Sequence, residues 1–266
     1  MYIKPKKSLG QNFLIDKNIQ NKIIRACRLS KEDIVLEIGS GKGDLTKQLA
    51  QSVKKVYALE IDQRLYPLLQ QAIGGHDNCQ IIKSDILKFN ISKFLQDNQV
   101  GQKIKVIGNI PYYISSPIIQ QLISYRQAIN IAFITVQKEF GRRAQAVPGS
   151  KEYGSFSCFV QYHCACDILF EIKRNSFKPA PNVDSCFLSL EFRSRPLVSV
   201  RDEESLFKLI RTAFNQRRKT LRNSLDGLVP LEELESFLQK AGIDKNVRPE
   251  DLSLEQFANL SNYLKF

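Results

Sequence analysis

One short motif in the sequence places hydrogen-bond acceptors directly beside an aromatic ring. Residues 109–112 read Asn-Ile-Pro-Tyr and follow an apolar run. The side-chain oxygen of Asn109 and the backbone carbonyl of Ile110 could accept the two hydrogens of an amine on an aromatic base. Both hydrogen bonds would strengthen as positive charge develops on the nitrogen, which stabilises a transition state. The motif therefore predicts chemistry at a poorly nucleophilic amine such as that of adenine.

The rest of this motif suits a planar substrate. Pro111 fixes the local backbone and adds no N–H donor that would compete with the two acceptors. Tyr112 offers an aromatic face on which a base can stack. Phe177, in a proline-rich loop over 175–185, is a candidate for a second face, and hydrophobic packing explains this residue equally well. The candidate catalytic residues are therefore Asn109, Ile110, Pro111 and Tyr112, and the candidate stacking residues are Tyr112 and Phe177.

A glycine-rich turn follows the first expected strand. Residues 37–43 read Glu-Ile-Gly-Ser-Gly-Lys-Gly and lead into a helical run. Glycines at a strand-to-helix turn let a ligand approach the backbone closely, so Gly39 and Gly41 are expected to contact a nucleotide-type ligand. A dinucleotide fingerprint would need glycine where this chain has Asp44, which argues against NAD.

Acidic residues end the next two expected strands. Glu60 ends the second strand, where an acidic side chain can accept hydrogen bonds from both hydroxyls of a ribose. Asp62 is a competing candidate for that role, and capping of a helix is its structural alternative. Asp85 follows the third strand and could accept from an adenine amine, beside Ile86, which could pack on the ring. The strand ends together predict a site for an adenosine-bearing ligand.

The elements that must position these residues alternate between two types. From residue 30 onward, short β-branched runs alternate with amphipathic stretches, which predicts an α/β fold with a mostly parallel, doubly wound sheet. The expected strands cover residues 34–39, 55–61, 79–84, 104–108 and 131–137. Two later strand-like runs, 156–166 and 187–192, are separated by a proline-rich loop and predict an antiparallel hairpin that closes the sheet.

The character of the sequence changes after Pro196. Helical periodicity with few strand formers covers 203–225, 231–241 and 254–266. We therefore predict a catalytic domain over residues 1–196 and a small all-α domain over residues 197–266, for which binding of RNA or the ribosome is the expected role.

The charge of the chain favours a polyanionic partner. The formal net charge is +12 and the isoelectric point is about 9.4, so nucleic acid is the leading partner, although a basic surface without that role explains the charge as well. If 211–222 is helical, basic side chains line one face and Phe214 and Leu221 the other. A solvated helix face is the alternative to phosphate contacts. The candidate RNA-binding residues are Arg211, Arg217, Arg218, Lys219 and Arg222.

Other classes of protein fit the sequence poorly. No apolar stretch approaches the roughly 20 residues that a membrane span needs, and the basic first residues do not resemble a secretory signal, so a cytoplasmic location is expected. With two histidines and scattered cysteines, few ligands are available and no metal is expected. In the absence of an obvious exposed apolar stripe, a monomer is expected.

Four motifs, taken in order, resemble those of the rRNA adenine dimethyltransferase family, and the resemblance covers essentially the whole chain. They are residues 11–16, 37–43, 109–112 and 175–185. The opening 5–14 and the late basic run 215–222 are similar in particular to the bacterial RsmA/KsgA branch of that family.

This resemblance implies a class I methyltransferase, Rossmann-like fold that uses S-adenosylmethionine. It further implies transfer of two methyl groups to each of two adjacent adenosines near the 3′ end of 16S rRNA, within the small ribosomal subunit, as a step of ribosome biogenesis. Tyr112 and Phe177 would correspond to the residues that stack on the target base. The residues matched to cofactor contacts are Asn12, Leu14, Gly39, Gly41, Glu60, Asp85, Ile86 and Asn109.

Three alternatives stay open on the sequence. Large-subunit rRNA methylases of the macrolide-resistance type share these motifs, so the target is less certain than the reaction. A ribosome assembly protein could keep the fold and lose catalysis, although the intact 37–43 and 109–112 motifs argue against this. An NAD-dependent oxidoreductase is disfavoured by Asp44 and by the lack of an evident acid-base residue.

Overall fold

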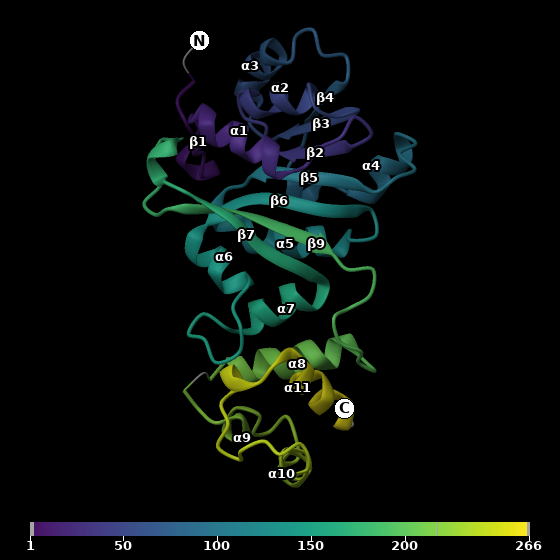
Figure 1. The fold of residues 1–266 in the computed structure, drawn as a ribbon, viewed down its shortest axis with the longest axis vertical. Helices are drawn as coiled ribbons and strands as arrows, with labels where there is room; N and C mark the ends of the chain where they lie inside the picture. The colour runs from purple at the N-terminus through teal and green to yellow at the C-terminus, as the bar shows by residue number, and fades with distance from the viewer. Residues whose placement is uncertain (1–2, 217, 265–266) are drawn as a thin grey trace. The chain divides into compact units, whose positions relative to one another are not determined.

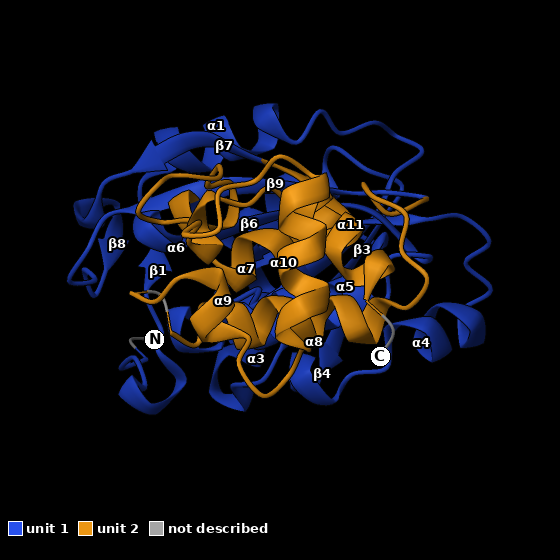
Figure 2. Cartoon of the chain, turned by 90° about the horizontal axis from the view of Figure 1, so that it is seen from below, with its two compact units in different colours: residues 1–141, 167–194 blue, residues 142–166, 195–266 orange. Residues whose placement is uncertain are grey.

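The structure is a computed structural model that describes residues 3–216 and 218–264 of the chain. It divides into two compact units (Figure 2): unit 1 comprises Met1–Gly141 and Asp167–Ser194, and unit 2 comprises Arg142–Cys166 and Arg195–Phe266. The sequence predicted a first domain that runs without interruption to residue 196. The structure differs, because the segment 142–166 has left unit 1 and shares a hydrophobic core with the C-terminal helices.

Unit 1 is built on one mixed sheet (Figure 1). The described residues place seven strands in it, in the spatial order β4 (Cys79–Lys83), β3 (Lys55–Glu60), β2 (Ile34–Ile38), β5 (Ile104–Asn109), β6 (Ile129–Gln137), β9 (Ser185–Phe192) and β7 (Cys164–Ile172). From β4 to β6 the neighbouring strands are parallel, and β9 joins β6 in antiparallel register. The α/β fold with a mostly parallel, doubly wound sheet is therefore confirmed.

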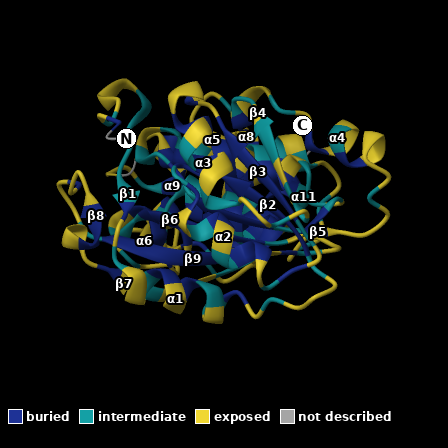
Figure 3. Cartoon of the chain, turned by 90° about the horizontal axis from the view of Figure 1, so that it is seen from above, coloured by how far each residue is buried: buried dark blue, intermediate teal, exposed yellow. Residues whose placement is uncertain are grey.

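The central parallel strands β3, β2, β5 and β6 are largely buried on both faces, as near-continuous apolar runs predict, whereas the edge strand β4 is only partly covered. Every residue of β2 is buried, and Figure 3 shows the central strands mostly in the buried colour, with most exposed residues on helices and loops. The helices of this unit are α1 (Lys17–Ala26), α2 (Asp44–Ala50), α3 (Tyr66–Ala72), α4 (Ile91–Asp97), α5 (Ser115–Ser124) and the first part of α6 (Lys138–Ala144). Short 3₁₀ turns lie at Lys7–Leu9, Gln63–Leu65, Ile86–Lys88, Tyr112–Ile114 and Arg174–Ser176.

A small separate sheet fixes the N-terminal segment in unit 1. Strand β1 (Phe13–Leu14) pairs in antiparallel register with β8 (Phe177–Lys178), so that Leu14 lies opposite Phe177. Asp16 then caps α1 by accepting from the backbone N–H of Asn18 at 2.9 Å. The motif at 11–16 is thereby fixed to the loop at 175–185.

The five strands expected from the sequence between residues 34 and 137 are confirmed to within about two residues at each end. The strand expected over 156–166 is wrong, because Ser155–His163 forms helix α7 and the strand β7 begins only at Cys164. Aromatic and β-branched residues favour a strand there, but burial of Cys158 and Tyr162 against α8 (Glu203–Phe214) overrides that preference.

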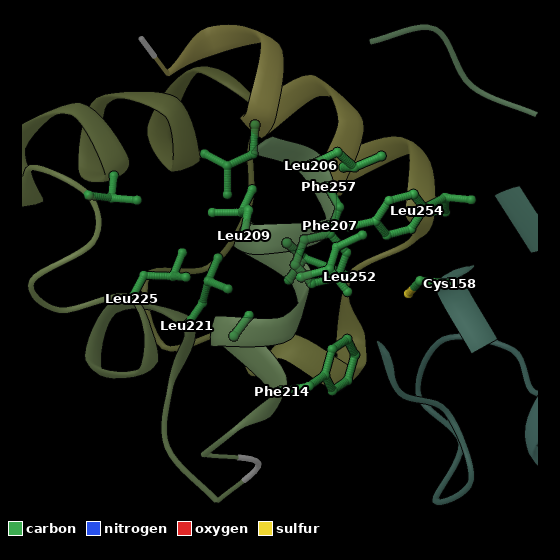
Figure 4. Close-up of a cluster of buried hydrophobic side chains, with 14 of the residues drawn as sticks. Cys158, Leu206, Phe207, Leu209, Phe214, Leu221, Leu225, Leu252, Leu254 and Phe257 are labelled. Carbon is green, nitrogen blue, oxygen red and sulfur yellow. The ribbon is translucent and has the colours of Figure 1, made fainter. Parts of the chain in front are cut away.

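Unit 2 is helical and has its own core (Figure 4). Leu206, Leu209 and Phe257 are buried within it, together with Tyr153 and Cys158 from the segment 142–166. Beyond α7 and α8, its helices are α9 (Leu221–Ser224), α10 (Leu231–Lys240) and α11 (Leu254–Tyr263), with a 3₁₀ turn at Pro249–Asp251. Among all the described residues, no helix has the length and apolar character that crossing a membrane requires.

Candidate active site

A cavity of about 260 Å³ lies in unit 1 at the carboxyl ends of the parallel strands. Strand order reverses between β2 and β5, and ligands of open α/β sheets bind at such a reversal. Most residues singled out in the sequence meet there. Its lining includes Asn12, Gly39, Gly41, Glu60, Asp85, Ile86, Asn109, Ile110, Pro111 and Tyr112.

The glycine-rich turn brings bare backbone to the cavity. Gly39 and Gly41 have φ of 74° and 59°, a region that favours glycine. A Cβ atom at Gly41 would lie 3.4 Å from the ring of Phe13, so a side chain would fill space that the turn leaves open. The backbone N–H of Gly39 donates to the carbonyl of Leu59 at 2.9 Å, which fixes the turn to the end of β3.

Glu60 connects this turn to its own strand. Its carboxylate accepts from the backbone N–H of Gly41 and from that of Asp62, each at 2.8 Å. Burial raises the pKa of Glu60, and the backbone hydrogen bonds oppose that shift. Since a carboxylate offers about four acceptor positions, two backbone donors leave capacity for a ligand hydroxyl.

Asp62 has a different role from Glu60. Its carboxylate accepts from the guanidinium of Arg64 at 2.6 Å and from the Gln11 amide at 2.9 Å, and it caps the 3₁₀ turn that follows β3. The guanidinium hydrogen bond holds the pKa of Asp62 well below its usual range. Asp62 does not line the cavity, so its position supports the capping interpretation.

Asp85 stands at the end of β4 beside a buried isoleucine. One of its oxygens accepts from the backbone N–H of Leu87 at 3.0 Å and so caps the short turn Ile86–Lys88. No hydrogen bond to the other oxygen joins it to any residue that the structure describes. The side chain of Ile86 is 5% exposed. This pairing of a free acceptor with an apolar surface suits the edge and face of an adenine ring.

The Asn109 side chain is held in one orientation by the N-terminal segment. Its Nδ2 donates to the backbone carbonyl of Asn12 at 2.8 Å, which assigns the amide and leaves Oδ1 as the acceptor. Within residues 3–216 and 218–264, neither this Oδ1 nor the carbonyl of Ile110 has a recorded hydrogen bond. The two acceptors predicted from the sequence are therefore both available at the cavity.

A hydrogen bond at its hydroxyl holds the Tyr112 ring in place. It begins a 3₁₀ turn after Pro111, and its hydroxyl lies 2.5 Å from Oγ of Ser185, the first residue of β9. Burial raises the pKa of this hydroxyl, so it stays protonated at neutral pH. The half-buried ring thus presents a fixed apolar surface beside the two acceptors.

Two predicted residues lie elsewhere. Leu14 is outside the cavity and lines a smaller adjoining recess, of about 50 Å³, with Gly41 and Asn109. Phe177 is 2% exposed and belongs to the core that includes Leu14. The structure does not bring Phe177 to the cavity, because its pairing with β1 turns the ring into the core. Of the two interpretations of Phe177, hydrophobic packing therefore agrees with its position.

The family can be assigned once this geometry is known. The family model described as "Ribosomal RNA adenine dimethylase" matches residues 3–265. The chain belongs to the ribosomal RNA adenine dimethylase family. Proteins named "Ribosomal RNA small subunit methyltransferase A" are similar over nearly the full length of this family member. The one from Clostridioides difficile is 41% identical over 97% of this chain and 90% of its own length, and the one from Bacillus pumilus is 44% identical over 98% and 91%.

Solved structures of comparable proteins share the fold of this rRNA adenine dimethylase family member. A dimethyladenosine transferase from Plasmodium falciparum superposes with a TM-score of 0.79 at 28% identity, covering 93% of this chain and 95% of its own. The 23S rRNA methyltransferase ErmE gives a TM-score of 0.75 at 26% identity, covering 95% and 99%. The methyltransferase fold implied by the sequence motifs is therefore confirmed.

Four of the five predicted RNA-binding residues of the family member lie in the described part of unit 2, and these four do not share one helical face. Helix α8 ends at Phe214 and α9 begins at Leu221, so the expected continuous helix over 211–222 is wrong. Arg211, Arg218 and Lys219 are exposed, and Arg222 forms an ion pair of 3.0 Å with Glu235. Arg217 lies outside the described residues.

Several features of the site were missed at the sequence level. Exposed apolar side chains of Ile61, Leu87 and Tyr113 line the cavity; each directly follows a residue or turn that the motifs had marked. Glu37 is 2% exposed and accepts from the Thr46 hydroxyl at 2.6 Å. Burial raises the pKa of Glu37 to about 7. In the sequence, the only indication of the buried Glu37 was a carboxylate within an otherwise apolar strand.

Proposed function

We propose that this chain transfers methyl groups from S-adenosylmethionine to the exocyclic amines of two adjacent adenosines near the 3′ end of 16S rRNA, in the small ribosomal subunit. The observation that carries the proposal is the pair of free acceptors, Oδ1 of Asn109 and the carbonyl of Ile110, beside the fixed ring of Tyr112. The small-subunit target is favoured because curated relatives at 41% to 44% identity carry that name, whereas the likeness to ErmE is 26%.

The residues at the cavity fit S-adenosylmethionine. Glu60 would accept from the ribose hydroxyls and the free oxygen of Asp85 from the adenine amine, while Ile86 would pack on the ring. Gly39 and Gly41 leave backbone exposed for close approach, since a Cβ at Gly39 would lie 3.4 Å from the Asn109 carbonyl. When bound, S-adenosylmethionine supplies a methyl group on a positively charged sulfur, an electrophile that a weak nucleophile can attack.

The residues of this chain would act on the target amine. An adenine amine is poorly nucleophilic because its lone pair is delocalised into the ring. Two acceptors fixed at Asn109 and Ile110 would hold both amine hydrogens, and they favour the geometry in which the lone pair is localised on nitrogen. The hydrogen bonds gain strength as the nitrogen becomes positive. No strong base is required, because the proton becomes acidic only as the new N–C bond forms, and it then leaves to water or to the carbonyl of Ile110.

A base in structured RNA must leave its stack to reach this cavity, and unstacking costs a few kcal/mol. The Tyr112 ring would replace part of that stacking, and its hydrogen bond to Ser185 keeps it in place before the base arrives. Exposed cations of unit 2, including Arg218 and Lys219, would contact RNA phosphates and bring the enzyme to its substrate. We further propose that the chain acts as a monomer without a metal ion.

The experiment that tests this proposal compares substrates. The purified chain is incubated with S-adenosylmethionine carrying a labelled methyl group and with small subunits, large subunits or naked rRNAs that lack adenine methylation. We expect label in small-subunit rRNA, recovered as N6,N6-dimethyladenosine. Label confined to large-subunit RNA would move the chain to the resistance type of methylase. Binding of the cofactor without transfer to any RNA would favour an assembly factor that has lost catalysis.

A further inference from the structure

A second space adjoins the cavity beside Tyr112. This outer recess, of about 310 Å³, is lined by Gly10, Asn12, Tyr112, Tyr113 and Gln137. The first four of these residues also line the cavity, whereas Gln137 lines only the outer recess. The two spaces therefore meet along Asn12 and Tyr112. Asn12 is joined to Asn109 by a hydrogen bond, and Tyr112 belongs to the same motif as Asn109.

Strand pairing places Gln137 next to the Tyr112 ring. Gln137 ends β6 and lies directly opposite Ser185 of β9. Directly opposed residues of an antiparallel pair point to the same face of a sheet, with Cβ atoms about 5 Å apart. Since Ser185 Oγ contacts the Tyr112 hydroxyl at 2.5 Å, the Gln137 side chain lies on the face that holds Tyr112.

The same face carries Asn109. Thr135 pairs with Asn109 across β5 and β6, and Gln137 is two residues beyond Thr135 on the same strand, so its side chain returns to the face of Asn109 and Thr135. Strand β5 has already ended at Asn109, and the motif turn begins there. Gln137 thus extends past the end of β5, alongside the turn that holds the acceptors.

Gln137 brings a free amide to this position. Among the polar side chains of the recess, Asn12 donates to the carbonyl of Gly10 at 3.4 Å and Tyr113 donates to that of Ser8 at 3.3 Å. The Gln137 side-chain amide has no hydrogen bond to any residue that the structure describes; the contact from Cys186 Sγ, at 3.8 Å, is to its backbone carbonyl. An amide group carries two donors and an acceptor, so it can read the edge of a base.

We propose that Gln137 is a specificity-determining residue that donates a hydrogen bond from its amide to a ring nitrogen of the target adenine. This inference rests on the proposed function, in which Asn109 and Ile110 hold the amine and Tyr112 supports the ring. In adenine, the unprotonated nitrogens N1 and N7 lie on either side of the amine, and each can accept from an amide N–H. Guanine has a protonated N1, which cannot accept, whereas its N7 accepts as that of adenine does, so a contact at N1 is the one that distinguishes adenine from guanine.

The test pairs a protein variant with single-atom changes in the base. Small subunits are reconstituted with 16S rRNA whose 3′ portion is ligated from a synthetic oligonucleotide carrying adenosine, 1-deazaadenosine or 7-deazaadenosine at the target positions. Methyl transfer to each is measured for the wild type, Gln137→Ala and Gln137→Glu. Gln96→Ala, which removes an exposed amide on α4, is the matched control.

We expect Gln137→Ala to lower kcat/KM on adenosine by about tenfold, the effect of removing one hydrogen bond, with unchanged affinity for S-adenosylmethionine. One of the two deaza bases should reduce the wild type by a similar factor and should reduce Gln137→Ala no further. Gln137→Glu, which replaces the donor by an acceptor, should be impaired at least as much as Gln137→Ala. Gln96→Ala should match the wild type.

Two results would overturn the inference. Wild-type activity of Gln137→Ala on adenosine would show that the amide does not contact the base. Equal sensitivity of the wild type and Gln137→Ala to both deaza bases would show that the loss arises from another contact. Either result leaves the proposed function intact, because the wild type still methylates adenosine; failure of the wild type on every substrate would instead contradict the proposed function.

Discussion

The Asn109 side chain donates to the backbone carbonyl of Asn12, 97 residues earlier in the chain, at 2.8 Å. This one hydrogen bond does two things. It turns Oδ1 of Asn109 into the available acceptor, and it attaches the N-terminal segment to the motif at the end of β5. The N-terminal segment is thus part of the candidate active site.

Asn109→Asp should therefore impair the enzyme although it keeps an acceptor in place. The new carboxylate has no N–H to donate, and one of its oxygens would face the Asn12 carbonyl at about hydrogen-bond distance. We expect methyl transfer to fall by about a hundredfold or more, the scale seen when one preorganised group of a transition-state site is removed. Hydrogen exchange should also accelerate in residues 8–14. Normal protection of that segment would contradict the positioning role of the Asn109 amide.

Two variants of Tyr112 separate the contribution of its ring from that of its hydroxyl. Tyr112→Phe keeps the surface for stacking and loses only the hydrogen bond to Ser185, so a decrease of less than about tenfold in kcat/KM is expected. Tyr112→Ala removes the surface, and a stacked base gives about 1–3 kcal/mol, or roughly 5- to 150-fold. Steady-state kinetics with small subunits measures both. Equal losses in the two variants would show that the hydroxyl, not the ring, is what matters.

Buried Glu37 makes the stability of the protein depend on pH. Its pKa is raised by burial to about 7 from an ordinary value of 4.5. Between these values the unfolded chain has lost the proton and the folded chain keeps it, so the free energy of unfolding falls as pH rises. Glu37→Gln removes this titration. The wild type should lose about 3 kcal/mol more than the variant between pH 4.5 and pH 8, as measured by chemical denaturation.

The thiols and tyrosines with raised pKa titrate above this range, and Glu60 is present in both proteins, so the difference between wild type and Glu37→Gln isolates Glu37. Identical pH dependence in the two proteins would mean that Glu37 is ionised in the folded state at neutral pH.

Exposed cations of unit 2 that have no carboxylate partner should contribute more to RNA affinity than cations that form an ion pair within the protein. Arg218 and Lys219 have no carboxylate partner among the described residues, whereas Arg222 is paired with Glu235. We expect Arg218→Ala with Lys219→Ala to weaken RNA binding and to lower the slope of log affinity against log salt by about one for each phosphate that is no longer neutralised. Arg222→Ala should change that slope less. An unaltered slope in the double variant would place the RNA-binding surface elsewhere.

Much of the sheet could be predicted from the sequence because its central strands are buried on both faces. Runs such as Ile34–Ile38 and Ile104–Asn109 are mostly apolar, and a glycine or an acidic residue lies at or just after the ends of β2, β3 and β4. Since the carboxyl ends of parallel strands meet at one edge, the order of the motifs along the chain was enough to bring Gly39, Glu60 and Asn109 to one cavity.

Where the predictions failed, tertiary packing decided the outcome. The aromatic and β-branched run at 156–163 suits a strand, yet it forms α7 because its buried side chains share the core of α8. The polar run 215–219 offers no apolar face to bury, so α8 ends at Phe214 rather than continuing to Leu225. Phe177 stands in a loop by sequence, but pairing of β8 with β1 turns it into a core.

Contacts between distant segments could also not be predicted from the sequence. The hydrogen bond between Tyr112 and Ser185 joins residues 73 positions apart, and nothing in the composition of either segment indicates it. The same applies to Gln137, which a sequence pattern alone shows only as the end of an expected strand.

The measurement that tests the account most directly is the amount of N6,N6-dimethyladenosine in small-subunit rRNA after incubation with S-adenosylmethionine and either the wild type or Asn109→Ala, quantified by mass spectrometry of the nucleosides. We predict that the wild type forms the dimethylated nucleoside, and that Asn109→Ala still binds the cofactor but forms little or none. Equal formation by both proteins would contradict it, because the amine would then be activated by groups other than those at the end of β5.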